Sequence, residues 1–160
     1  MSKLLYLARH AKSSWDDPTL SDFERPLNKR GKRDAPFIAG VLACRNVRPE
    51  LIVSSPARRA EETAKTYHHY LGGEFRFDSR IYEAGTMSLY YLILEYFDKT
   101  DTLMVVGHNP GLTELNNYLC NETIDNIPTA GIVALRFDDS VASHQARRLF
   151  YLYPKAFMQG

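Results

Sequence analysis

Cysteine, uncompensated charge and long apolar runs are all scarce in this chain. Its 160 residues include two cysteines, Cys44 and Cys120, and neither has another Cys or a His near it at the spacing of a zinc site. We therefore expect no metal centre of that kind. Two reduced, mostly buried thiols are the interpretation we favour, although a disulfide between them stays open.

The charges of the chain nearly cancel, because 20 Lys and Arg face 19 Asp and Glu and leave a formal net charge of +1 at pH 7. Proteins that bind the nucleic-acid backbone carry a marked excess of basic residues, so we expect no nucleic-acid partner. The N-terminal apolar stretch ends at Arg9 after a few residues, which is too short for the core of a signal peptide or for a membrane span. We expect no membrane association and, by default, a cytoplasmic location; the sequence does not predict an oligomeric state.

The remaining composition, 44% hydrophobic and 24% charged residues, is typical of a globular protein, and the length fits one domain over residues 1–160. Short apolar runs alternate with segments of helical spacing, which predicts an α/β fold with a mainly parallel sheet. Two late strands are expected to form an antiparallel hairpin at one edge. The predicted strands cover residues 3–9, 51–54, 102–106, 132–137 and 146–152, and the predicted helices cover residues 31–44, 56–71, 86–98 and 110–119.

Prolines and glycines mark several of these boundaries. Ser55 is a typical N-cap and Pro56 fits the first turn of the helix that follows. Gly72 and Gly73 are expected to end that helix. Pro36 is tolerated only near the start of the preceding helix, so the pattern does not fix where that helix begins. Residues 155–160 are expected to form a loose tail.

Basic and imidazole side chains follow three of the predicted strands. Because open α/β sheets bind their ligands at the carboxyl ends of the strands, we expect these side chains to line one site. Cations and imidazoles gathered there indicate a pocket for an oxyanion. The three groups are Arg9 with His10, His108 with Asn109, and, at the start of the helix after residue 56, Arg58 with Arg59.

His10 is the candidate nucleophile. Neutral imidazole is well populated near pH 7, attacks phosphorus and can leave again, which suits a covalent phosphoryl carrier. Arg9 and Arg59 are candidate clamps for the phosphoryl oxygens, because a guanidinium is a planar, permanently charged fork. The alternatives are a structural histidine that bonds a backbone carbonyl and a solvated helix arginine, and the second fits Arg58 better than Arg59.

Three further residues are candidates for the same site. His108 follows a glycine and precedes a proline that opens a helix, so it could donate an N–H to the transferred phosphoryl group where the helix start also favours negative charge; the alternative is a loop histidine that caps the helix. Asn109 could add its backbone N–H. Glu83 lies at the end of a predicted short strand and could protonate a leaving group, with a plain surface glutamate as the alternative.

Together these motifs resemble the histidine phosphatase superfamily, also called the phosphoglycerate mutase-like fold, and within it the small SixA-type phosphohistidine phosphatases. The matching stretches are Leu7–Trp15, Arg25–Gly31, Ser54–Ala64, Tyr82–Ala84 and Val105–Gly111. They occur in the expected order over most of the chain. The resemblance implies a three-layer α/β sandwich with a central, mainly parallel mixed sheet flanked by helices.

The resemblance also implies roles for individual residues. It makes His10 the phosphorylated nucleophile, Arg9 and Arg59 phosphate ligands, and His108 the second histidine of the pocket. Arg59 is selected over its neighbour because the family pattern places two residues between Ser-Pro and Arg-Ala. Glu83 aligns with the proton donor of larger members.

The chain departs from the family pattern at two positions. Ala11 stands where the broad family has glycine, a replacement that the SixA-like branch shares, so the tight turn must accept a Cβ atom. Asp16 replaces an asparagine of the mutases, and its carboxylate either points away from a bound phosphate or selects substrates with a cationic group. The chain lacks the long insertions that cover the substrate in mutases and acid phosphatases, so its open rim suits a phosphorylated protein or a small molecule equally.

The predicted function is therefore a phosphatase that works by double displacement through a phosphohistidine and acts on phosphohistidine in proteins. We expect no metal and no cofactor, because the pocket supplies its own cations and no carboxylate cluster suggests a metal site. One alternative is a phosphatase of small phosphomonoesters, or a mutase, on the same fold. The other is a noncatalytic phosphate-binding module.

Overall fold

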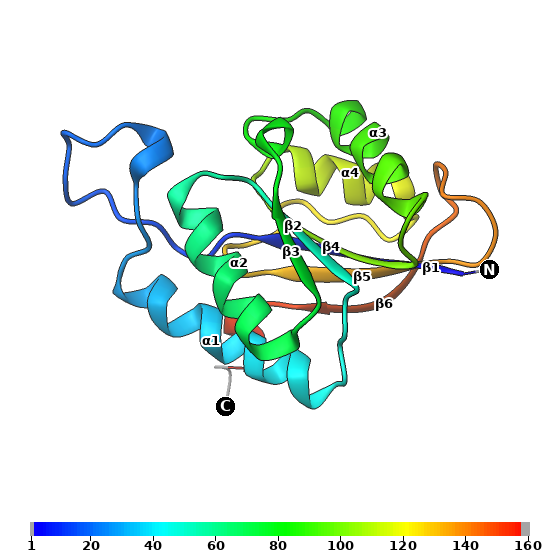
Figure 1. Cartoon of the computed structure of the whole chain (residues 1–160), viewed down its shortest axis with the longest axis horizontal. Helices are drawn as coiled ribbons and strands as arrows, with labels where there is room; N and C mark the ends of the chain where they lie inside the picture. Colours follow the sequence, from blue (N-terminus) through cyan, green and yellow to red (C-terminus); the bar gives the residue numbers. More distant parts are fainter. Residues whose placement is uncertain (1, 158–160) are drawn as a thin grey trace.

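One continuous sheet of six strands runs through residues 2–157, the part of the chain that the computed structural model describes (Figure 1). The strands are β1 (Lys3–Arg9), β2 (Leu51–Ser54), β3 (Glu74–Phe77), β4 (Thr102–Gly107), β5 (Ile132–Phe137) and β6 (Arg147–Leu152). They lie in the order β3-β2-β4-β1-β5-β6. β1, β2, β3 and β4 are mutually parallel, whereas β5 pairs antiparallel with β1 and with β6. The predicted mixed, mainly parallel sheet and the antiparallel pair at its edge are confirmed.

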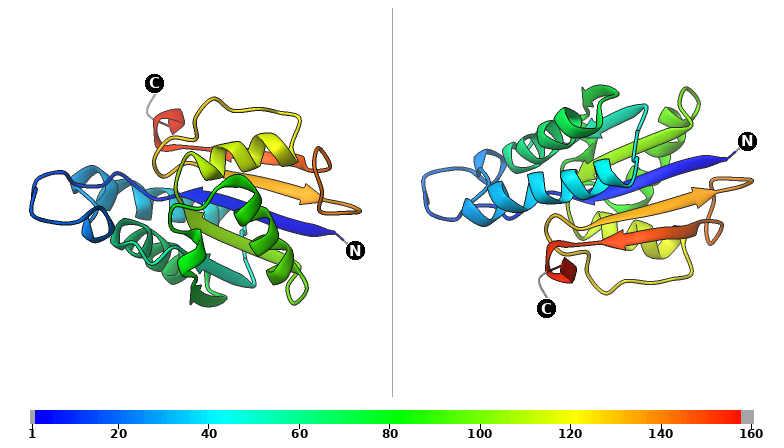
Figure 2. Two further views of the ribbon diagram at one scale, coloured as in Figure 1. Left: turned by 90° about the horizontal axis from the view of Figure 1, so that it is seen from above. Right: turned by 90° about the horizontal axis from the view of Figure 1, so that it is seen from below.

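Four helices cover the two faces of this sheet. α1 (Lys29–Cys44) and α2 (Arg58–Leu71) lie on one face, and α3 (Thr86–Phe97) and α4 (Gly111–Leu119) lie on the other (Figures 1 and 2). The central strands are therefore buried on both sides, which explains why they read as continuous apolar runs rather than as alternating patterns. All four residues of β2 are buried, for example. The three-layer α/β architecture implied by the resemblance is confirmed.

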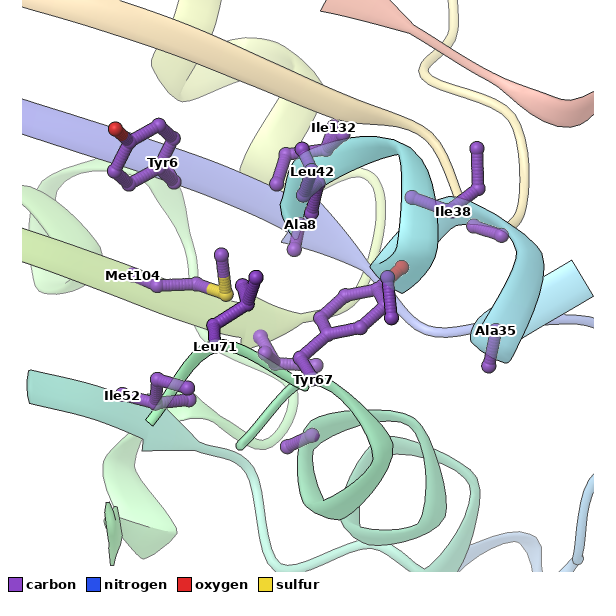
Figure 3. Close-up of a cluster of buried hydrophobic side chains, with 14 of the residues drawn as sticks. Tyr6, Ala8, Ala35, Ile38, Leu42, Ile52, Tyr67, Leu71, Met104 and Ile132 are labelled. Carbon is purple, nitrogen blue, oxygen red and sulfur yellow. The ribbon is translucent and has the colours of Figure 1, made fainter. Parts of the chain in front are cut away.

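A hydrophobic cluster lies on each face of the sheet. Successive side chains of β1 alternate between the two clusters, as expected for a strand. Tyr6 and Ala8 join the cluster beneath α1 and α2, and Leu5 and Leu7 join the cluster beneath α3 and α4. Figure 3 shows the first cluster, in which Tyr67 of α2 is completely buried. This packing fixes the positions of the strand ends that carry the candidate site.

Two helix starts differ from the predictions. α1 begins at Lys29 because the side chain of Asn28 caps it, accepting a hydrogen bond from the backbone N–H of Gly31 at 2.8 Å; Pro36 consequently lies inside the helix. α2 begins at Arg58, so the prediction that Ser55 caps it is wrong. The Ser55 hydroxyl instead accepts the backbone N–H of Ala57 at 3.2 Å, in a turn that precedes the helix.

The cysteines and the C-terminal tail also differ in part from expectation. Both thiols are free, and Cys120 is buried, but Cys44 is exposed because it is the last residue of α1. Residues Pro154–Phe157 form a 3-10 helix, and the ring of Phe157 packs edge-to-face on Phe37 of α1 at 5.4 Å between centroids. The prediction of a loose tail is therefore wrong for residues 155–157, and residues 158–160 lie outside the described part of the chain.

The loop between β1 and α1, residues 10–28, extends beyond the carboxyl ends of the parallel strands (Figure 1). The base of the loop is closed by a bridge between Ser13 and Leu27 and by a hydrogen bond from the Ser14 N–H to the Pro26 carbonyl at 2.8 Å. A short 3-10 helix, Asp22–Glu24, brings the returning half of the loop against α2. The loop thus forms one wall of the sheet edge where the candidate site lies.

Candidate active site

His10 and His108 lie side by side at the ends of two adjacent parallel strands. β1 and β4 pair so that Arg9 is opposite Gly107, and the backbone N–H of His10 donates to the Gly107 carbonyl at 3.1 Å. The two imidazole rings are consequently 5.2 Å apart between centroids. The topology thus brings together two histidines that are 98 positions apart in the sequence, as the strand-end pattern predicted.

One ring nitrogen of His10 is held by the backbone. Nδ1 lies 2.7 Å from the carbonyl oxygen of Ala11. A carbonyl oxygen only accepts, so Nδ1 carries the proton in the neutral ring and Nε2 keeps a free lone pair. The structural contact and the chemical role are therefore compatible, because the contact fixes the tautomer that a nucleophile needs.

Ala11 itself is accommodated without strain. It is buried, its φ angle is not in the left-handed region, and its N–H donates to Thr63 Oγ1 at 3.0 Å. The turn after the first strand therefore does not require glycine at this position.

His108 is anchored to the end of the neighbouring strand. Its Nε2 lies 2.8 Å from the hydroxyl of Ser55, which directly follows β2. Its Nδ1 is buried and has no hydrogen-bond partner among residues 2–157. A buried polar atom without a partner is uncommon.

Arg59 lies in the first turn of α2 and is 6% exposed, whereas its neighbour Arg58 is exposed. Arg9, the last residue of β1, donates through Nη1 to the carbonyl of Ile127 at 2.8 Å. The Nε atoms of both Arg9 and Arg59 are buried and lack a partner within the described residues. Both guanidiniums are near enough for their charges to lower the pKa values of His10 and His108.

Burial and these cations keep both imidazoles neutral. Burial lowers the pKa of His10 to about 3; the bond to Ala11 opposes the shift, and the neighbouring His108 and arginines add to it. Burial and the charge of Arg59 likewise lower the pKa of His108 to about 4. At pH 7 the free site therefore combines two positive guanidiniums with two neutral rings, one of which presents a lone pair.

The two rings are expected not to titrate between pH 5 and 7, because protonation is opposed by burial and by neighbouring cations. Carbon-proton NMR of the imidazole C–H groups tests this, with His10→Ala and His108→Ala assigning the signals. An unfolded chain protonates these rings near pH 6.5, so the free energy of unfolding is expected to fall as the pH drops from 6.5 toward 4. A titration midpoint of His10 near 6.5 would contradict the expectation.

Asp22 is a residue of the site that sequence reasoning missed. Arg59 donates to it twice, from Nη1 to its carbonyl at 2.7 Å and from Nη2 to Oδ2 at 3.0 Å. Tyr82 donates to Oδ2 at 2.7 Å and Arg25 to Oδ1 at 3.1 Å. Partial burial would raise the pKa of Asp22, but the bonds from Tyr82, Arg25 and Arg59 hold it well below its usual range.

No local signal could have distinguished Asp22 from other loop carboxylates, because its partners Arg59 and Tyr82 are 37 and 60 positions away. Asp16, the loop residue that the sequence singled out, is exposed, and its side chain makes no hydrogen bond or ion pair to any residue between 2 and 157. The carboxylate that pairs with Arg59 is thus that of Asp22 and not that of Asp16.

The side chain of Glu83 makes no hydrogen bond or ion pair to any residue between 2 and 157, so none links it to the histidines and arginines of the site. Glu83 is exposed, with a positive φ of 58°. The predicted strand before it is wrong, because residues Ser79–Ile81 form a 3-10 helix that Asp78 caps by accepting the Arg80 N–H. Glu83 does follow Tyr82, whose ring is 5.6 Å from that of His108, so it lies near the mouth of the site.

The side chain of Asn109 has a structural task. It donates to Asn126 Oδ1 at 3.0 Å and to the Ile127 carbonyl at 2.8 Å, and it accepts from the hydroxyl of Thr113 at 2.8 Å. Because the Ile127 carbonyl also accepts from Arg9, Asn109 helps to position that guanidinium. Its predicted backbone contact to phosphate stays a prediction.

No group of three or more His, Cys, Asp or Glu is placed to hold a metal ion within residues 2–157. No helix of the same range is long and apolar enough to cross a membrane.

Comparison with known proteins places these observations in a family context. A family model described as "Histidine phosphatase superfamily (branch 1)" matches residues 5–90. An uncharacterised protein of Mycobacterium tuberculosis is 33% identical over 148 residues, covering 86% of this chain and 89% of that protein. An uncharacterised chloroplastic protein of Arabidopsis thaliana is 36% identical over 135 residues, 78% of this chain, and the match spans only 62% of its own length.

Solved structures show the same architecture. A candidate phosphohistidine phosphatase SixA from Agrobacterium tumefaciens has a TM-score of 0.83 and 29% identity, covering 95% of this chain and 98% of that one. The protein histidine phosphatase SixA complexed with tungstate has a TM-score of 0.83 and 23% identity, covering 96% and 99%. A mycobacterial glucosyl-3-phosphoglycerate phosphatase has a TM-score of 0.72 and 18% identity, covering 93% and 98%.

Proposed function

Because the chain belongs to the histidine phosphatase superfamily, we propose that it is a metal-independent phosphatase that forms a phosphohistidine at His10 and acts on phosphohistidine in proteins. One observation carries the proposal: a neutral imidazole with a free Nε2 lies 5.2 Å between ring centroids from a second neutral imidazole, near the buried guanidinium of Arg59 and the half-buried guanidinium of Arg9. This set combines a nucleophile with ligands for an oxyanion.

The residues of the site divide the reaction into two displacements. Nε2 of His10 attacks phosphorus, a bond forms between nitrogen and phosphorus, and the bond to the leaving group breaks with its electron pair. Arg9, Arg59 and His108 hold the oxygens as their charge redistributes. Water then attacks the phosphorylated His10 and releases inorganic phosphate, which returns the ring to its starting state.

Protonation of the leaving group depends on the substrate. An alkoxide requires a proton, and Glu83 is our proposed donor because it lies next to Tyr82 at the mouth of the site. An imidazole leaving group needs less help, since a proton already on its other ring nitrogen lets it depart as neutral imidazole. A phosphohistidine substrate therefore depends less on Glu83 than an alkyl phosphate does.

A protein substrate is supported by the open edge of the sheet and by the similarity to SixA at 29% identity over nearly the whole chain. The opposing candidate is a small phosphomonoester, favoured by the related fold of the glucosyl-3-phosphoglycerate phosphatase. A noncatalytic phosphate-binding module is disfavoured, because the free Nε2 of His10 is a feature that binding alone does not need.

A substrate panel tests the proposal. Phosphate release is measured from a phosphohistidine peptide, an aryl phosphate and several sugar phosphates, each with and without chelator. We expect the peptide to have the highest kcat/KM and the chelator to have no effect. During turnover we expect a phosphoryl group on His10 that survives a rapid alkaline quench, is lost in acid and is located by peptide mass. Preference for a sugar phosphate would support the small-molecule candidate, and binding of phosphate without any turnover would support the module.

The proposal also covers the domain organisation of the chain and its location in the cell. We propose that residues 1–160 form one histidine phosphatase domain, because the single sheet joins strands from both ends of the chain. We also propose a cytoplasmic location, although the Arabidopsis relative is named chloroplastic; fractionation of cells that express the tagged chain tests this.

A further inference from the structure

The carboxylate of Asp22 is exposed to solvent beside Arg59, on the loop of residues 10–28 that forms one wall of the site. The side chain of Asp22 is 49% exposed, whereas the side chains of its cationic partners Arg25 and Arg59 are 10% and 8% exposed. A ligand that places its phosphoryl group against Arg59 therefore brings the adjoining atoms close to a negative charge.

We propose that Asp22 determines the substrate class of this site: it disfavours phosphates that carry a second anionic group near phosphorus and favours those whose neighbouring group is neutral or cationic. This inference rests on the proposed function and deepens it. A phosphoimidazole in a peptide segment rich in basic side chains belongs to the favoured class, and a phosphorylated carboxylic acid belongs to the disfavoured class.

Asp22 is held in this position by partners on three segments. Arg59 of α2 bonds both its carbonyl and its carboxylate, Tyr82 bonds Oδ2, and Arg25 bonds Oδ1. A carboxylate with three donors is fixed in place and stays ionised. To turn away from an approaching anion it would have to give up these three hydrogen bonds.

Arg25 does not offer a compensating site for a second anion. Its Nη1 is committed to the hydroxyl of Ser13 at 2.7 Å and to the Ser14 carbonyl at 3.3 Å, and its guanidinium lies 3.6 Å from the centre of the exposed Trp15 ring. Because Trp15 covers one face of this guanidinium, Arg25 supports the loop rather than the ligand. The exposed carboxylate in direct contact with Arg59 at this wall is that of Asp22.

The test uses matched substrates that differ in one side charge: phenyl phosphate, 3-carboxyphenyl phosphate and 3-(aminomethyl)phenyl phosphate. Two unit charges about 6 Å apart in a well-solvated site change an equilibrium by about threefold, so exchanging an ammonium for a carboxylate there changes it by about tenfold. We expect the wild type to prefer the ammonium to the carboxylate compound by about tenfold or more in kcat/KM. Asp22→Asn, which keeps an acceptor for Arg59 and Tyr82, is expected to reduce that ratio by about tenfold while phenyl phosphate changes less.

Asp16→Asn is the matched control, because it removes the same charge from an exposed position on the same loop; its ratio is expected to stay within about twofold of the wild type. Equal kcat/KM for the two charged compounds in the wild type, or an unchanged ratio in Asp22→Asn, would overturn the inference. Calorimetric binding of the corresponding non-hydrolysable phenylphosphonates gives the same ratios without turnover. If the chain is not a phosphatase, none of the phosphates is hydrolysed, but the ratio of phosphonate affinities can still be measured and still tests the role of Asp22.

Discussion

Replacement of His10 by alanine is expected to reduce phosphate release from both a phosphohistidine peptide and an aryl phosphate by about 10⁴-fold or more. Removal of a covalent nucleophile typically has an effect of this size, because the arginines and His108 bind the phosphoryl group but cannot form the intermediate. Steady-state kinetics measure the loss, and the quench experiment is expected to find no phosphorylated residue. Binding of phenylphosphonate is expected to remain within about tenfold of the wild type.

A matched control separates this loss from unfolding. His10 is 7% exposed, so the variant leaves a small cavity and its melting temperature must be measured. His68→Ala removes a half-buried histidine of α2 that bonds the Gly73 carbonyl at 2.9 Å, in the last turn of the helix. It is expected to retain full activity. Equal rates for wild type and His10→Ala would exclude the phosphohistidine mechanism even if the chain were an active phosphatase.

The parts of the fold that the sequence predicted are those with local causes. β1 and β4 are short apolar runs that end abruptly in functional groups, and parallel pairing then places Arg9 opposite Gly107. The position of His10 beside His108 follows from these two facts. Likewise, the choice of Arg59 over Arg58 agrees with burial of the first and exposure of the second.

The parts that were missed depend on contacts between distant residues. Ser55 reads as a helix cap, but its hydroxyl is shared by the Ala57 N–H and by His108 across the sheet. Asp22 is equivalent in sequence to the solvated Asp16, and only the return of the loop against α2 gives it two arginine partners. Such assignments require the tertiary structure, because propensity and spacing do not encode the partner.

Arg59→Ala is expected to lower kcat/KM for phosphohistidine peptide and aryl phosphate by about 10³-fold. Arginines that hold a transferring phosphoryl group contribute effects of this order. Arg59→Lys keeps the charge but loses the planar fork, so an intermediate loss is expected. Arg58→Ala, which removes the adjacent exposed arginine, is the matched control and is expected to stay within about twofold. Comparable losses of kcat/KM in Arg58→Ala and Arg59→Ala would contradict the assignment of Arg59 as the ligand of the phosphoryl oxygens.

Arg59→Ala is also expected to weaken phosphate binding through Asp22, and a double variant isolates this contribution. Without Arg59 the Asp22 carboxylate keeps only Arg25 as an ion-pair partner among residues 2–157, and it then repels a bound phosphoryl group more strongly. Arg59→Ala with Asp22→Asn is therefore expected to bind phenylphosphonate several-fold more tightly than Arg59→Ala alone, so the two substitutions are non-additive. If Asp22→Asn changes nothing in the Arg59→Ala background, the carboxylate does not act on the bound oxyanion, and Arg59 contributes only through its own contacts.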